Sequence, residues 1–147
     1  LKNIKVPTTI MTNSAENNGN IFGAVDYLNH KKDIINTGVT IKEYEGGISY
    51  HGKSMTIDDD IAIVGSFNMD MRSAYIDTEL MLVINSKDIN KQLKASMEEY
   101  EKKAATVKNE TEYSHIPEGM KMKELSDKKK NIKAWFGWAM NGLRFLF

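Results

Sequence analysis

The 147-residue sequence contains no cysteine and only three histidines, His30, His51 and His115. Without cysteine the chain can form no disulfide, no thiolate metal site and no cysteine nucleophile. Three scattered histidines are also too few for a histidine-rich metal site. We therefore expect no histidine-rich metal site, and we assign no cofactor.

The sequence also lacks net charge, with 20 basic and 20 acidic side chains, and it lacks long apolar runs. Zero net charge argues against binding of nucleic acid by bulk charge, so no nucleic-acid partner is expected. No apolar run approaches the roughly 20 residues that a membrane-spanning helix needs. Apolar residues still make up 41% of the chain, which excludes general disorder and favours one domain or a part of one.

The spacing of apolar residues predicts an α/β chain. We expect strands over residues 4–12, 40–44, 48–57, 61–64 and 78–85. We expect helices over residues 21–38 and 86–105 and from 127 to the end. Gly46 and Gly47 predict a hairpin-type turn between the second and third strands.

The polar stretch 106–120, with Pro117 and Gly119, is typical of a linker. It would divide the chain into a domain over 1–105 and a C-terminal helix over 121–147.

Polar residues gather in the window 50–79. His51 and Lys53 are two apart in a predicted strand, so they project from the same face. Ser66 and Asn68 have the same spacing just past the next strand. A tight turn at 58–60 would place the two strands side by side, and the four side chains would then converge.

This combination of side chains suits a phosphoryl group. Lys53 supplies positive charge, while Ser66 and Asn68 supply neutral donors to the non-bridging oxygens. His51 can attack phosphorus or transfer a proton. A histidine nucleophile needs its second nitrogen held by an acceptor, and Glu79, the single charge in its apolar strand, is the candidate.

The same window resembles the motif of the phospholipase D superfamily, which is His-x-Lys, four residues, Asp, six residues, Gly-Ser-x-Asn. The matching residues are His51, Lys53, Asp58, Gly65, Ser66 and Asn68. The continuation to Ser73, with Glu79 eleven residues after Asn68, is similar to the cardiolipin synthase branch. Upstream, Thr12–Ser14 and Glu43–Tyr44 resemble the approach to the second motif of those enzymes, so the resemblance covers roughly residues 3–105.

The resemblance implies a mixed sheet flanked by helices and metal-free phosphatidyl transfer from a phospholipid to an alcohol through phosphohistidine. His51 would be the nucleophile or its acid partner, and Glu79 would orient it. Lys53 and Asn68 would hold the phosphate with support from Ser66. Asp58 belongs to the catalytic motif, although local hydrogen bonds that lock the turn are a simpler role for it.

The chemistry of that family needs two motifs, and this sequence has one. His30 and His115 lack a lysine two residues later. We expect a C-terminal portion of a two-motif enzyme, in part because the chain starts at Leu1 and little sequence precedes His51. Pairing of two identical chains across a two-fold axis is the alternative.

Two other functions stay open. One is a phospholipase D-type phosphodiesterase or nuclease that works as a homodimer. The other is a catalytically silent interaction module, although such a module would have no need to keep His51, Lys53, Ser66, Asn68 and Glu79 together.

The C-terminal end is basic and aromatic, with Lys128–Lys130 and Lys133 before Trp135 and Phe136. This pattern fits a helix that lies in a membrane interface and is attracted to anionic lipid. The expected location is then cytoplasmic membrane-associated. Packing of the helix against its own domain or against the absent half is the alternative.

Asp70 and Arg72 follow the motif and have two interpretations. They contact a lipid headgroup, or they form a salt bridge and the start of a helix.

Overall fold

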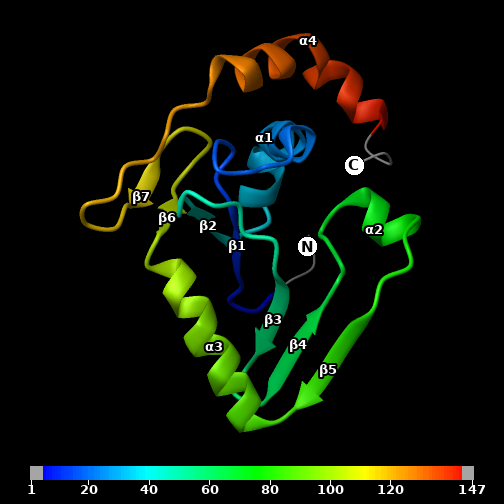
Figure 1. Ribbon diagram of the computed structural model, residues 1–147, viewed down its shortest axis with the longest axis vertical. Helices are drawn as coiled ribbons and strands as arrows, with labels where there is room; N and C mark the ends of the chain where they lie inside the picture. Colours follow the sequence, from blue (N-terminus) through cyan, green and yellow to red (C-terminus); the bar gives the residue numbers. More distant parts are fainter. Residues whose placement is uncertain (1–4, 144–147) are drawn as a thin grey trace. The chain divides into compact units, whose positions relative to one another are not determined.

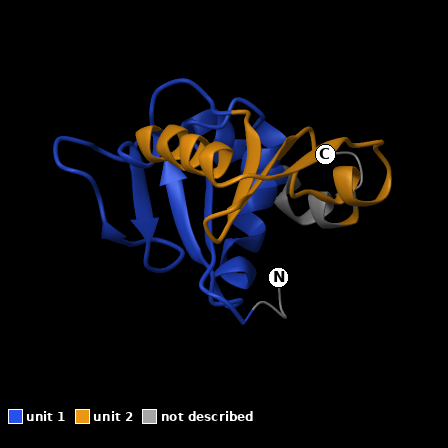
Figure 2. Ribbon diagram, turned by 90° about the horizontal axis from the view of Figure 1, so that it is seen from below, with its two compact units in different colours: residues 1–50, 100–141 blue, residues 51–99, 142–147 orange. Residues whose placement is uncertain are grey.

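The computed structural model describes residues 5–143, which form a mixed α/β structure (Figure 1). The described chain divides into two compact units (Figure 2). The first comprises the residues up to Tyr50 and again Tyr100–Asn141, and the second comprises His51–Glu99 and, among the described residues, Gly142–Leu143 at the end of the last helix. The α/β class predicted from the sequence is confirmed.

The first unit is built on a four-stranded sheet with the order β1-β2-β6-β7. Its strands are β1 (Thr9–Asn13), β2 (Thr40–Tyr44), β6 (Ala104–Val107) and β7 (Tyr113–His115). β1 and β2 are parallel, and the other two pairs are antiparallel, so the sheet is mixed. Its helices are α1 (Ile21–Ile35) and α4 (Asp127–Leu143).

Helix α1 makes the crossover between the parallel strands β1 and β2, as parallel pairing requires. The side chain of Asn20 caps its N-terminus by accepting hydrogen bonds from the main-chain N–H groups of Phe22 and Gly23. After the last turn, Gly38 adopts a φ of 84°, a left-handed conformation that glycine adopts without strain. The predicted helix at 21–38 is confirmed, with its end three residues earlier.

The core of the first unit contains a buried ionic cluster around Glu43 of β2. Its carboxylate accepts hydrogen bonds from the hydroxyls of Tyr27 (2.6 Å) and Tyr113 (2.5 Å) and pairs with Lys31 (2.8 Å). Burial raises the pKa of both tyrosine hydroxyls above the ordinary value, and the nearby carboxylate adds to this effect. Every charge in the cluster therefore has a partner, as buried ions require.

The second unit is an antiparallel sheet with the order β3-β4-β5 and two helices. The strands are β3 (Lys53–Ile57), β4 (Ile61–Gly65) and β5 (Met81–Asn85). The helices are α2 (Met71–Tyr75) and α3 (Lys87–Glu101), whose last two residues belong to the first unit. Buried Asn90 of α3 donates to the carbonyl of Ile61 at 2.6 Å and so ties the helix to the β3–β4 hairpin.

The segment before His51 differs from its prediction. Strand β3 starts at Lys53 rather than at residue 48, and β2 pairs with β1 and β6 instead of forming a hairpin with β3. The predicted hairpin at Gly46–Gly47 is therefore wrong. The segment 48–50 forms hydrogen bonds with the side chains of Asn13, at the end of β1, and Asn17, in the β1–α1 loop, and a β-type sequence pattern cannot reveal such partners.

The stretch predicted as a linker, 106–120, also has a different structure. Its first residues complete β6, and it contains β7, which pairs with β6. Asn109 closes the turn between them by accepting hydrogen bonds from the N–H groups of Thr111 (3.0 Å) and Glu112 (2.9 Å). The division into domains at 105 and 120 stays a prediction.

Candidate active site

Four residues of the predicted site lie at one end of the three-stranded sheet of the second unit. Lys53 lies opposite Gly65 on β4, and Gly65 lies opposite Met81 on β5. His51 comes two residues before β3 begins, Ser66 directly follows β4, and Glu79 comes two residues before β5 begins. Because neighbouring strands are antiparallel, these four positions share the sheet end that leads to α2 (Figure 1).

The Lys53 ammonium group lies against the His51 imidazole. Its Nζ is 2.9 Å from each ring nitrogen and 2.9 Å from the His51 carbonyl oxygen, to which it donates. The pKa of Lys53 lies below its usual value, because partial burial disfavours the charged ammonium group. The carboxylates of Glu79 and Asp70 oppose this effect without cancelling it. The predicted pairing of His51 and Lys53 is present, although His51 lies just outside the strand and is exposed.

Ser66 joins β4 to the start of β5. Its hydroxyl donates to the Glu79 carboxylate and accepts from the N–H of Leu80 at 3.1 Å, and its own N–H donates to the Leu80 carbonyl at 3.0 Å. The hydrogen bond from Ser66 lowers the pKa of Glu79, and the Lys53 charge lowers it further. The Glu79 carboxylate is thus held in its ionised form next to Ser66.

This contact differs from the predicted role of Glu79, which was to hold His51. The strand order explains the difference, because β4 lies between β3 and β5. Ser66, directly after β4, is therefore the neighbour of Glu79, which precedes β5. His51 precedes β3, and β3 is separated from β5 by β4. Within the described chain the Glu79 carboxylate orients the serine hydroxyl. We name His51, Lys53, Ser66 and Glu79 the His51 cluster.

Asn68, Asp70 and Arg72 follow β4, and two of them have structural partners. Asp70 caps α2 by accepting a hydrogen bond from the N–H of Ser73 at 2.7 Å. Arg72 pairs with Asp77 at 3.0 Å. The helix-start and salt-bridge interpretation of these two residues matches their contacts. Asn68 is half-buried three residues after β4 ends, and its phosphate-binding role stays a prediction.

Asp58 lies away from the His51 cluster. It occupies the β3–β4 turn with a φ of 47°, at the opposite end of the hairpin from Lys53. Five residues of extended strand separate the two, a span of roughly 16 Å. Lys94 of α3 donates to the Asp58 carbonyl (2.5 Å) and to the Asp59 carboxylate (2.7 Å). Asp58 therefore lies in the turn, away from the His51 cluster, and its role stays a prediction.

The described residues contain no group of three or more histidine, aspartate or glutamate side chains that could hold a metal ion. What the His51 cluster offers to a ligand is a cation, an imidazole and a hydroxyl. His51 and Ser66 are exposed, so a substrate can reach both. Donors of this kind match the oxygens of a phosphoryl group.

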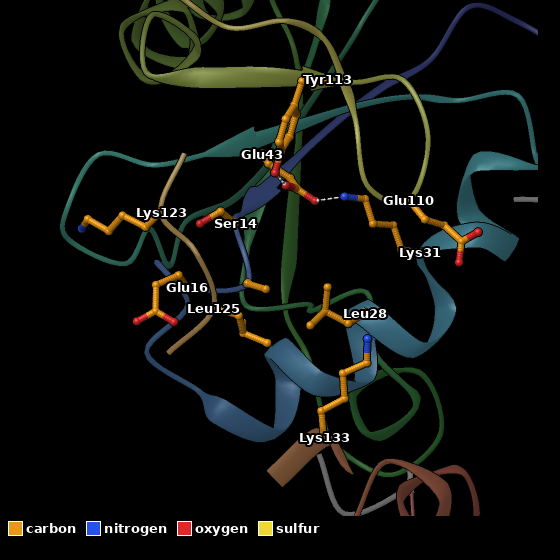
Figure 3. Close-up of a pocket in the computed structure, with 11 residues that line it drawn as sticks. Ser14, Glu16, Leu28, Lys31, Glu43, Glu110, Tyr113, Lys123, Leu125 and Lys133 are labelled. Carbon is orange, nitrogen blue, oxygen red and sulfur yellow. Dashed lines mark hydrogen bonds and ion pairs between the residues drawn. The ribbon is translucent and has the colours of Figure 1, made fainter. Parts of the chain in front are cut away.

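A cavity of about 210 Å³ lies in the first unit and does not involve the His51 cluster (Figure 3). Its lining includes Ser14, Lys31, Glu43 and Tyr113. The close-up shows Lys31 and Glu43 pointing toward each other across it. Because the Glu43 carboxylate is already bound by three donors, we interpret these polar groups as structural.

Helix α4 is anchored by a buried lysine. The Nζ atom of Lys129 donates to the carbonyls of Ala15 (2.8 Å), Glu16 (2.6 Å) and Asn18 (3.0 Å), and only 7% of the residue is exposed. Lys129 therefore attaches the first turn of α4 to the β1–α1 loop. This contact fits the alternative interpretation of the C-terminal helix, in which it packs against its own domain.

Other residues of α4 face solvent, among them Lys128, Lys130 and Trp135, which is 81% exposed. The predicted helix from 127 is confirmed as far as Leu143. Residues 144–147, also included in the prediction, lie outside the described part. No helix in the part of the chain that the structure describes is long and apolar enough to cross a membrane.

Sequence reasoning missed Asn13 as a residue of interest at this site. Its side chain makes two hydrogen bonds to the main chain of Tyr50, the residue directly before His51. The sequence did offer one indication of its importance, because Asn13 belongs to the stretch Thr12–Ser14 that resembles the upstream part of the family motif.

The chain is similar to proteins of one known family. The family described as "Cardiolipin synthase, PLD-like domain" matches residues 1–100. Cardiolipin synthase A of Wigglesworthia glossinidia brevipalpis is 35% identical over 68 residues, which are 46% of this chain and 14% of that protein. Cardiolipin synthase A of Yersinia pseudotuberculosis is 33% identical over 78 residues, which are 53% of this chain and 16% of that protein.

The matched segments are thus only about one sixth of the length of these curated relatives. The family match, in contrast, spans most of this chain and includes every residue of the His51 cluster. The chain belongs to the phospholipase D-like domain family of the cardiolipin synthases.

Proposed function

We propose that this chain is the C-terminal catalytic part of a phosphatidyltransferase that moves a phosphatidyl group between glycerol-type alcohols. The observation that carries the proposal is the meeting of His51, Lys53 and Ser66 at one sheet end, in a chain of this family. The names of its relatives support the choice of a phospholipid substrate.

In the proposed reaction an imidazole nitrogen of His51 attacks phosphorus, and the bond from phosphorus to the leaving alcohol oxygen breaks. A second histidine, from another motif copy, donates a proton to that oxygen. The acceptor alcohol then attacks phosphorus and gives its proton to that second histidine, while the bond from phosphorus to His51 breaks, so both imidazoles return to their starting state. A missing N-terminal half is our proposed source of the second histidine, and a second identical chain is the alternative source.

The other members of the His51 cluster stabilise negative charge in this scheme. Lys53 binds a non-bridging oxygen, and its charge matters most as electron density builds on the phosphoryl group. Ser66 donates to a second oxygen when its hydroxyl turns from Glu79 to the substrate. Glu79 keeps the hydroxyl at the correct place before substrate binds.

The substrate is a membrane lipid, so we also propose that the exposed side of α4 binds the cytoplasmic surface of a membrane. Lys128, Lys130 and Trp135 are exposed on this helix. Cations beside tryptophan favour the interface of an anionic bilayer.

The test is phosphatidyl transfer by the full-length protein with His51→Ala, using labelled glycerol as the acceptor. We expect turnover to fall on the order of 10³-fold or more, because the attacking group is gone. His115→Ala is the matched control, since His115 is an exposed histidine on β7, outside the cluster. It should keep wild-type turnover.

Near wild-type transfer by His51→Ala would contradict the proposed mechanism. Release of phosphatidic acid without any labelled product would instead replace the transferase with a hydrolase that uses the same residues.

A further inference from the structure

The main chain that leads into His51 is held by residues at the end of β1 and in the β1–α1 loop. The Nδ2 atom of Asn13 donates to the Tyr50 carbonyl at 2.8 Å, and its Oδ1 accepts from the Tyr50 N–H at 2.8 Å. One side chain thus satisfies both main-chain groups of Tyr50, as a neighbouring strand would. Tyr50 needs this partner because it lies outside the strands.

Asn13 is itself well supported. It is the last residue of β1, where it is paired with Tyr44 of β2. Its Oδ1 also accepts a hydrogen bond from Asn17, which is only 8% exposed and donates in addition to the Ile48 carbonyl. The N–H of Gly19 binds the Ser49 hydroxyl at 3.2 Å. Consecutive residues 48, 49 and 50 are therefore all held by the last residue of β1 and the loop that follows it.

The Tyr50 side chain is fixed as well. Its ring lies 4.4 Å from the Tyr100 ring and 6.4 Å from the Tyr44 ring, measured between centroids. The Tyr44 and Tyr100 rings are 5.6 Å apart. These separations are in the range of favourable aromatic pairs. Tyr50 is thus held at both its main chain and its ring, and its peptide bond leads directly to His51.

We infer that Asn13 is a positioning residue for His51, a role that rests on the proposed function. It touches no substrate and acts through the Tyr50 peptide. The role requires asparagine, because this side chain presents a donor and an acceptor together, whereas ionised aspartate only accepts. Precise placement matters because displacement of a reacting group by about 1 Å can lower a rate by about 100-fold.

The experiment compares Asn13→Ala, Asn13→Asp and Asn109→Ala in the full-length protein. Asn109 is the matched control because its side chain also accepts from two main-chain N–H groups, in the β6–β7 turn. We expect Asn13→Ala to lower kcat 10- to 100-fold with KM within about threefold of wild type. Asn13→Asp keeps the acceptor for the Tyr50 N–H and should recover part of kcat. Asn109→Ala should keep wild-type kcat.

A second readout needs no activity. The chain has three histidines, so the imidazole NMR signals of His51 can be followed against those of His30 and His115. We expect Asn13→Ala to shift or broaden the His51 signals alone, while Asn109→Ala leaves them unchanged.

The inference would be overturned if Asn13→Ala kept wild-type kcat, lost activity only through KM, or left the His51 signals unchanged. The proposed function fails separately, if the wild-type protein transfers no phosphatidyl group or if His51→Ala retains its turnover.

Discussion

Gly65 of the motif ends β4 and is paired with Met81, the first residue of β5. A Cβ atom placed there would lie 2.1 Å from the Leu80 carbonyl oxygen and 2.9 Å from Met81 Cα. Both are main-chain atoms, so β5 would have to move to make room. The glycine of the motif is therefore required by packing, and it allows the contact between Ser66 and Leu80.

We expect Gly65→Ala to lower the free energy of unfolding by about 1–3 kcal/mol, the usual cost of overpacking. Urea denaturation of the 147-residue chain measures the change. Gly142→Ala is the matched control, because a Cβ atom at Gly142 in α4 meets nothing within 4 Å. Equal stability of Gly65→Ala and wild type would show that the two strands can separate freely at this point.

The residue spacing predicted part of the His51 cluster and not all of it. The positions of His51, Lys53 and Ser66 at one sheet end follow from two strands joined by a tight turn, and the structure has that hairpin. The partner of Glu79 depends instead on which strand lies in the middle of the sheet. That order arises from pairing between strands distant in sequence, which local spacing does not encode.

At the scale of elements, the lysines at the start of helix α4 differ in burial and in their contacts. Lys129 is buried against the β1–α1 loop, whereas Lys128 and Lys130 face solvent. Composition alone treats these three residues as one basic run. The docked lysine could not be identified from the sequence, because its partners are main-chain carbonyls more than a hundred residues earlier.

The membrane proposal predicts a specific effect of the two exposed lysines. Replacing Lys128 and Lys130 with Gln should weaken binding of the 147-residue chain to anionic vesicles roughly 10- to 30-fold, since each lysine near such a surface contributes about 1 kcal/mol. Vesicle sedimentation with phosphatidylglycerol measures the affinity.

The same change at Lys87 and Lys91, exposed on α3, controls for net charge and should have a smaller effect. If both pairs reduced binding equally, the attraction would be general and α4 would have no special part in it.

For the whole molecule, the sequence indicated the α/β class and the strands around the motif. It did not indicate the two compact units, whose boundaries at Tyr50 and Tyr100 fall inside predicted elements. The first unit joins strands from both ends of the chain, since β2 pairs with β6. Such long-range pairing is set by tertiary packing rather than by local pattern.

The central claim is that His51 and Lys53, with Ser66, bind a phosphoryl group at one end of the second unit's sheet. The most direct measurement is titration of the 147-residue chain with inorganic phosphate, followed by NMR of its three imidazoles. We predict saturable shifts of the His51 signals, unchanged His30 and His115 signals, and roughly tenfold or greater loss of affinity in Lys53→Ala. His51 signals that do not respond to phosphate, or that respond equally in Lys53→Ala, would contradict the claim.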